Sequence, residues 1–132
     1  MDYVSREWID AGAQFLKEFD QRYPVKVAFW LKEADDPFWY LFIASDHIKD
    51  TNLTDAYREV LNVAKVMQDP NLDPFRVKLQ VKPEWIRAAM NIQARFPVKT
   101  GTRIQGGTFG GYGVDDVYIY PALGAAVPPS HP

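Results

Sequence analysis

The 132-residue chain contains no cysteine, and this absence removes three kinds of chemistry at once. Without thiols there can be no disulfide bond, no thiolate zinc site and no cysteine nucleophile. Histidine is also scarce, since only His47 and His131 are present. The sequence has no H-E-x-x-H zinc motif and no EF-hand spacing, so no metal site is predicted from a motif.

A strong net charge and a long apolar run are missing as well. The formal charge is −2, whereas a protein that coats DNA is usually strongly basic. The longest uninterrupted apolar run, Phe38 to Ala44, is far shorter than the roughly 20 residues that cross a bilayer. The first seven residues hold no apolar stretch typical of a secretory signal. We therefore expect a soluble, cytoplasmic protein without a membrane partner.

Phosphate-binding motifs are absent from the glycine-rich stretch between residues 99 and 113. Gly106 and Gly111 have the spacing of a P-loop, but Tyr112 and Gly113 stand where lysine and serine or threonine are required. The stretch predicts a hairpin or bulge with positive φ angles, and a flap or partner contact is the functional alternative. Its candidate residues are Gly106, Gly107, Gly110, Gly111 and Gly113. No cofactor is predicted.

The residues that are present describe a globular chain with an aromatic surplus. Hydrophobic residues make up 47%, charged residues 24% and aromatic residues 14% of the sequence, which suits a sizeable core. Helical spacing of apolar residues predicts helices over 5–23, 54–68 and 83–96. A two-residue period or a short apolar run predicts strands over 25–32, 38–44, 75–82, 102–105 and 114–120.

This order, αββαβαββ, predicts an α+β fold. The first two strands are joined by a short turn and should form an antiparallel hairpin, which argues against a purely parallel Rossmann sheet. We expect a mainly antiparallel, or mixed, sheet of about five strands with three helices packed on it. A single domain over residues 1–120 and a flexible Pro/Ala-rich tail over residues 121–132 complete the prediction.

Catalytic candidates are confined to three residues near strand ends. Asp46 and His47 follow the second predicted strand, and Asp116, next to Asp115, begins the last one. Imidazole and carboxylate groups could hold a divalent metal if they met in space, which would give a metal-assisted hydrolase. Carboxylates are also commonplace in turns, where they bond the local backbone. Neither Ser5 nor Ser45 lies in a G-x-S-x-G elbow, so a serine hydrolase is not predicted.

Basic and aromatic residues alternate along three of the predicted strands. If alternate residues project from one side, the sheet presents cations among rings on a single face. The members of this predicted face are Lys26, Trp30, Lys32, Arg76, Lys78, Lys82, Tyr118 and Tyr120. Such a face suits a protein partner or self-association, single-stranded nucleic acid, or merely solvent.

The sequence alone does not establish a function. The leading hypothesis is a small non-enzymatic interaction module, which could be a homodimer, working through the aromatic and basic face or the glycine-rich loop. Single-stranded nucleic-acid binding and metal-assisted hydrolysis are the alternatives.

Overall fold

The computed structural model describes residues 4–95 and 101–123, which build an α+β fold around a six-stranded sheet. Three α-helices belong to this part of the chain: α1 (Arg6–Phe19), α2 (Leu53–Met67) and α3 (Pro83–Arg95). The strands are β1 (Val27–Glu33), β2 (Tyr40–Ala44), β3 (Val77–Lys78), β4 (Thr102–Gln105), β5 (Thr108–Phe109) and β6 (Tyr112–Ile119). Two short 3₁₀ turns, η1 (Asp50–Asn52) and η2 (Pro74–Arg76), precede α2 and β3.

The sheet is mixed but mostly antiparallel, as the sequence predicts. Its order is β3-β2-β1-β6-β4, and β5 pairs only with β6. Only the pairing of β2 with β3 is parallel among the described strands. The fold class is therefore confirmed, with six strands where about five are predicted. The additional strand, β5, is two residues long, which is too short to show a period in the sequence.

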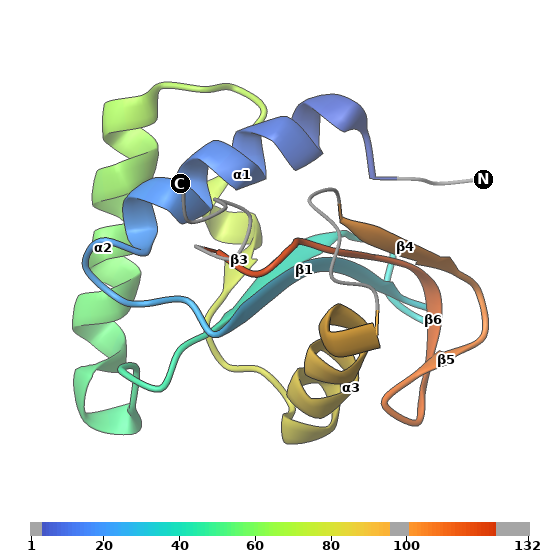
Figure 1. Ribbon diagram of the computed structural model, residues 1–132. Coiled ribbons are helices and arrows are strands. Elements are labelled where there is room, and N and C mark those ends of the chain that lie inside the picture. Colours follow the sequence, from blue (N-terminus) through green and yellow to red (C-terminus); the bar gives the residue numbers. More distant parts are fainter. Residues whose placement is uncertain (1–3, 96–100, 124–132) are drawn as a thin grey trace, which may run out of the picture.

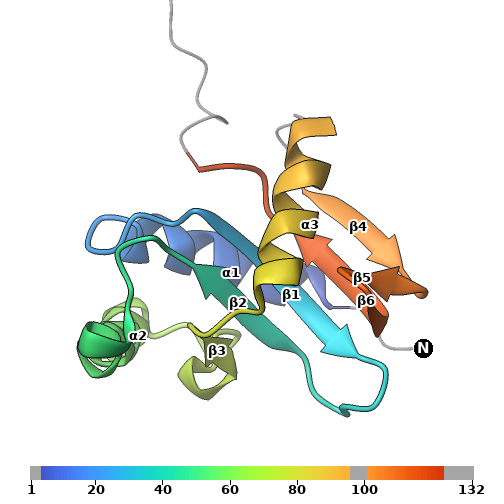
Figure 2. The same ribbon diagram turned by 90° about the horizontal axis from the view of Figure 1, so that it is seen from below.

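Helices cover both faces of the sheet. Figure 1 shows α1 and α2 on one face and α3 on the other. From below, Figure 2 shows α3 lying across the sheet. On this side α3 also reaches β2 through Trp85, whose ring centroid lies 5.0 Å from that of Phe42.

Strand β1 is the centre of two separate hydrophobic cores. Its even-numbered residues Ala28 and Trp30 join the core beneath α1 and α2, while Phe29 and Leu31 join the core beneath α3. The first six residues of β1 are consequently all buried. The alternation of Lys and apolar residues in this segment predicts one solvated face, and this prediction is wrong because the strand lies between two layers of helices.

Local signals place the helix starts better than the helix ends. The Ser5 hydroxyl accepts a hydrogen bond from the Trp8 N–H at 3.1 Å and caps α1, as predicted. Helix α1 ends at Phe19, before the predicted Tyr23, and the Asp20 carboxylate then accepts a bond from the Val25 N–H at 2.7 Å. Helix α3 begins at Pro83, as expected for a residue that lacks an N–H.

The predicted strand over residues 75–82 is mostly wrong. Only Val77 and Lys78 pair with β2, because Asp73 caps a 3₁₀ turn at the Phe75 N–H. Beyond β3, the Leu79 N–H donates to the Tyr57 hydroxyl at 3.0 Å instead of to a strand. Alternating side chains predict an extended segment, but the segment forms a strand only where a neighbouring strand is available for pairing.

Some predictions lie beyond the part of the chain that the structure describes. Residues 1–3, 96–100 and 124–132 are not described, and these include His131 and all but the start of the predicted tail. Within residues 4–95 and 101–123, no helix has both the length and the apolar character needed to span a membrane.

Candidate functional site

The predicted aromatic and basic face does not exist as a single surface. Trp30 pairs with Tyr118 across β1 and β6, so both side chains lie on the α1 side of the sheet. Lys78 pairs with Phe42, whose ring belongs to the core on the α3 side. Trp30 and Lys78 therefore project from opposite faces. The premise of one shared side is wrong because alternation within a strand does not fix which face its neighbours share.

The aromatic half of the prediction is part of the core. Trp30 is 1% exposed, and its Nε1 donates to the Tyr120 hydroxyl at 2.9 Å. Tyr120 donates in turn to the Ile9 carbonyl of α1 at 2.7 Å. Burial raises the pKa of Tyr120 above its ordinary value, so the hydroxyl stays protonated. Tyr118 is half-buried, and its hydroxyl accepts a bond from the Gly101 N–H. These rings join α1 to the sheet.

The two lysines predicted on the same face are held by aspartates. Lys26 is exposed and pairs with Asp46 at 3.2 Å. Lys32 is buried and its Nζ lies 2.5 Å from an oxygen of Asp115. The exposed pair of Lys26 with Asp46 contributes little to stability, and neither lysine lies on an open aromatic surface.

The three catalytic candidates are not brought together. Ala44, two residues before Asp46, pairs with Val27, whereas Asp116 pairs with Lys32. Five residue steps along β1 separate these positions by about 17 Å. Among residues 4–95 and 101–123, no three His, Asp or Glu side chains gather closely enough to hold a metal ion. The convergence that a metal site at these residues would require is therefore not found in the described part of the chain.

Asp116 instead lies buried on the α1 side of the sheet, where it pairs with the exposed Arg103. Its carboxylate is in a residue that is 1% exposed, and an oxygen lies 3.6 Å from Nε of Arg103 on β4. Burial raises the pKa of Asp116, and the guanidinium of Arg103 partly offsets that rise. Arg103 also donates to the Val4 carbonyl at 2.9 Å, so this cluster connects β4 and β6 to the start of α1.

The glycine-rich stretch is a hairpin, as its structural interpretation predicts. Gly106 and Gly107, with φ of +73° and +82°, separate β4 from β5. Gly110 and Gly111 form the turn between β5 and β6 with φ of +58° and +87°, the pattern of a tight two-residue hairpin turn. A Cβ on Gly110 would lie 2.8 Å from the Glu84 carbonyl, so the hairpin sits against the start of α3.

This hairpin carries Tyr112 to the basic residues that precede α3. Lys82 Nζ lies 4.9 Å from the centre of the Tyr112 ring and 5.4 Å from that of Trp85. The Tyr112 and Trp85 rings meet edge to face with centroids 5.8 Å apart. The glycine-rich loop and Lys82, which are separate candidates in the sequence, thus meet at one place.

A second group of cations and rings lies on β2 and β3. The Arg76 guanidinium lies 4.1 Å above the Phe38 ring and 5.9 Å from that of Tyr40. Lys78 Nζ lies 4.8 Å from the Tyr40 ring. Tyr40 contacts Phe42, and Phe42 contacts Trp85, with centroids 6.3 and 5.0 Å apart. Ring contacts therefore connect this group with Lys82 and Tyr112.

We name this surface the cation–aromatic strip. Its outer members are Phe38, Tyr40, Arg76, Lys78, Lys82 and Tyr112, and Phe42 and Trp85 lie beneath them. Cations within about 6 Å of a ring face are attracted by the ring quadrupole, which holds the long side chains in place. The sequence identifies the three cations. It does not identify their rings, because Phe38 and Tyr40 sit in an unbroken apolar run and Tyr112 sits among glycines.

One polar atom beneath the strip has no partner. The indole Nε1 of Trp85 is buried and makes no hydrogen bond to any group in the described part of the chain. Buried indole N–H groups are usually bonded, so this donor is an exception at the place where the hairpin, α3 and the strip meet.

Comparison of the chain with models of protein families, with characterised proteins and with solved structures gave no match.

Proposed function

We propose that this chain is a non-enzymatic interaction module that binds an extended, acidic segment of a protein partner on the cation–aromatic strip. The observation that carries the proposal is the Arg76 guanidinium at the molecular surface, 4.1 Å from the centre of the Phe38 ring and 5.9 Å from that of Tyr40. Arginine and aromatic residues are the side chains most enriched at the energetic centre of protein interfaces. A guanidinium that is already stacked on a ring in the free protein loses less conformational entropy when it binds a carboxylate of the partner.

The surroundings of the strip support a contact surface rather than a solvated one. Phe38 is 46% exposed although its ring is large and apolar. Lys78 and Lys82 have no carboxylate within 4.0 Å among the described residues, so their charges are available to a ligand. Tyr112, at the other end of the strip, is 37% exposed.

A protein segment fits the charge of the strip better than a nucleic acid does. Only three cations belong to it, and Arg76 already has the Asp73 carboxylate at 3.7 Å. Asp36 and Glu84 lie close in sequence to strip residues, and the net charge of the chain is negative. A nucleic-acid surface relies on a continuous basic track along the phosphates.

The test compares two polymers of known composition. A Glu/Tyr copolymer stands for an acidic aromatic segment, and a thymidine homopolymer stands for single-stranded nucleic acid. We expect the copolymer to shift the amide NMR signals of residues 38–40, 76–82 and 112, and the Trp85 indole signal. The double variant Phe38→Ala/Arg76→Ala should lower the affinity by about tenfold or more, as truncating a central arginine usually does.

An exposed arginine away from the strip provides the control. Arg87→Ala removes the same charge from the outer side of α3 and should leave copolymer binding unchanged. Copolymer binding that Phe38→Ala/Arg76→Ala does not weaken would overturn the proposal. Tighter binding of the thymidine polymer, with a steep loss on adding salt, would favour the nucleic-acid alternative.

A further inference from the structure

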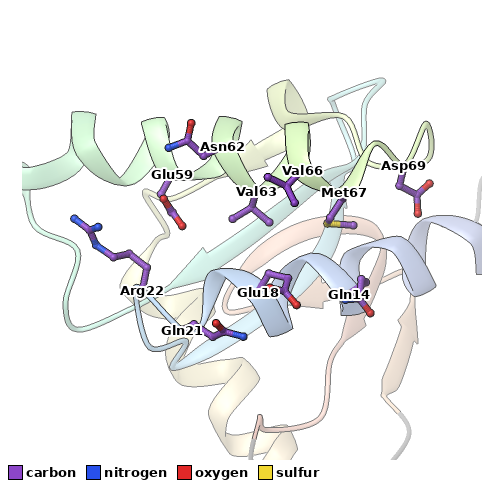
Figure 3. Close-up of a pocket in the computed structure, with 10 residues that line it drawn as sticks. All are labelled: Gln14, Glu18, Gln21, Arg22, Glu59, Asn62, Val63, Val66, Met67 and Asp69. Atoms are coloured by element: carbon purple, nitrogen blue, oxygen red, sulfur yellow. The ribbon is translucent and has the colours of Figure 1, made fainter.

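A groove of about 710 Å³ lies between α1 and α2, away from the strip. Figure 3 shows the two helices running in opposite directions with side chains pointing toward one another. Helix α1 contributes Gln14 and Glu18, the turn after it contributes Gln21, and α2 contributes Glu59, Val63 and Val66. The residues of α1 are spaced i, i+4 and those of α2 i, i+4, i+7, which places each set on one side of its helix. The groove therefore runs parallel to both helix axes.

The groove is acidic with an apolar centre. Val63 is buried at its base, whereas Val66 is 84% exposed although it is fully apolar. Its charged lining consists of Glu18, Glu59, Asp69 and Arg22. Figure 3 places Arg22 and Glu59 at one end and Asp69 at the other. From the start of α2 to its end, the groove presents a cation (Arg22), a carboxylate (Glu59), the two valines and a second carboxylate (Asp69). Glu18 lies near the middle.

The outward side of α3 has the opposite pattern. Trp85 and Ala89 are buried against the sheet. Exposed on the other side are Glu84, Arg87, Met90, Asn91, Ala94 and Arg95. Met90 is 41% exposed and lies between the two arginines. Neither guanidinium has a carboxylate within 4.0 Å among residues 4–95 and 101–123.

We infer that the groove receives α3 of a second copy of this chain. With α3 laid parallel to α2, Glu84 meets Arg22, Arg87 meets Glu59 and Arg95 meets Asp69. Met90 then covers Val63 and Val66. The lengths agree, since Arg87 to Arg95 and Glu59 to Met67, where α2 ends just before Asp69, each span about 12 Å at 1.5 Å per residue. Opposite charges thus meet at both ends of the pair of helices, and an apolar side chain covers the apolar centre.

This contact joins two different surfaces of the chain. The groove belongs to the helices on one side of the sheet, and α3 lies on the other side (Figure 1). A copy whose groove is filled still offers its own α3 to another copy. Such head-to-tail contacts close into rings or extend into filaments, and do not stop at a two-fold dimer. The strip is not part of the contact, so self-association and the proposed partner binding are separable.

Charge exchange tests the inference with two variants of the full chain. Glu18→Lys/Glu59→Lys reverses the groove and leaves α3 intact, whereas Arg87→Glu/Arg95→Glu reverses α3 and leaves the groove intact. We expect the native chain to form species larger than a 15.1 kDa monomer at low salt, by sedimentation velocity at rising concentration. Each variant alone should associate at least about tenfold more weakly, because like charges would meet. An equimolar mixture should recover the native association.

A control and thermal unfolding keep the outcome decisive. Glu7→Lys/Asp50→Lys makes the same charge change at exposed positions outside the groove and should assemble like the native chain. Each variant should still unfold in one cooperative transition, which shows that a loss of association is not a loss of the fold. A native chain that stays monomeric at millimolar concentration would overturn the inference. So would a mixture that stays monomeric, or either variant that assembles as tightly as the native chain, since the contact would then not join the groove to α3.

Discussion

At the scale of single residues, the hydrogen-bonded chain of Trp30, Tyr120 and Ile9 fastens α1 to the sheet. The Tyr120 hydroxyl both accepts from Trp30 and donates to Ile9. Tyr120→Phe would leave the buried indole N–H without an acceptor, a loss of about 1–3 kcal/mol. We expect the free energy of unfolding, measured with urea, to fall by that amount. Tyr112→Phe should change it little, because no hydrogen bond of its hydroxyl is present in the described residues, and an equal loss in both variants would contradict the assignment.

The buried carboxyl of Asp116 makes the free energy of unfolding depend on pH. Its pKa is raised from 3.8, so the folded chain binds more protons than the unfolded chain above that pH. The contribution of Asp116 to stability therefore falls as pH rises from 3.8 through the pKa of the folded state. We expect Asp116→Asn to gain stability relative to the native chain between about pH 4 and about pH 7 in urea titrations.

The comparison for Asp116 is Asp50→Asn at an exposed position. Both variants lose one carboxylate, so the comparison corrects for the change in net charge. If the Asp116→Asn difference stayed constant over this pH range, or changed in the opposite direction, Arg103 and not burial would dominate the titration of Asp116.

At the scale of elements, the hairpin between β5 and β6 depends on glycines to different degrees. Gly110 has a positive φ and touches the Glu84 carbonyl, Gly111 has a positive φ in open space, and Gly113 has neither constraint. Substitution by alanine should therefore destabilise the fold in the order Gly110, Gly111, Gly113. We expect about 1 kcal/mol for Gly111→Ala from strain in the left-handed region, and more for Gly110→Ala because of the added clash.

The position of Tyr112 provides a second measurement of the same hairpin. Gly110→Ala should displace the Tyr112 ring from Trp85 and change the Trp85 indole signal in NMR spectra. Gly113→Ala should leave that signal unchanged. Equal effects of all three alanine substitutions on stability would show that the hairpin turn is not held against α3.

The elements also show how far the sequence could be interpreted. Helices with caps and a strong apolar stripe are predicted well, since Ser5 and Pro83 mark true starts. Strand 75–82 is predicted on its alternation, but only two of its residues find a partner strand. Alternating polar and apolar residues indicate that one side of an extended segment is buried. A loop that packs against α2, as this one does through Leu79 and Tyr57, gives the same alternation as a strand.

The candidate site could be predicted only in part for a related reason. Arg76, Lys78 and Lys82 are visible as a basic set in the sequence, and they do lie on one surface. Their assignment to the face of Trp30 fails because β3 reaches the sheet through α2 and pairs in parallel with β2. Which residues of two such strands share a face depends on the crossover connection and on packing. The sequence of either strand alone does not determine it.

At the scale of the whole molecule, two hydrophobic cores share one central strand. Trp30 lies in the core beneath α1 and α2, and Trp85 lies in the core beneath α3. Because β1 contributes alternate residues to both, loss of either core removes half of the burial that holds β1 in place. We therefore expect both cores to unfold in one cooperative transition.

Fluorescence from each core can be followed separately to test this cooperativity. Trp85→Phe leaves the three tryptophans of the α1 side, Trp8, Trp30 and Trp39, whereas replacing those three with phenylalanine leaves only Trp85 as a reporter of the α3 side. Each variant should show a single urea transition whose midpoint coincides with that of its own backbone circular dichroism. A Trp85 signal that changes at lower urea than the backbone signal would mean that α3 and the hairpin separate from the sheet first. The strip would then be a surface that forms and opens independently of the α1 side, because Lys82, Trp85 and Tyr112 all belong to that separating part.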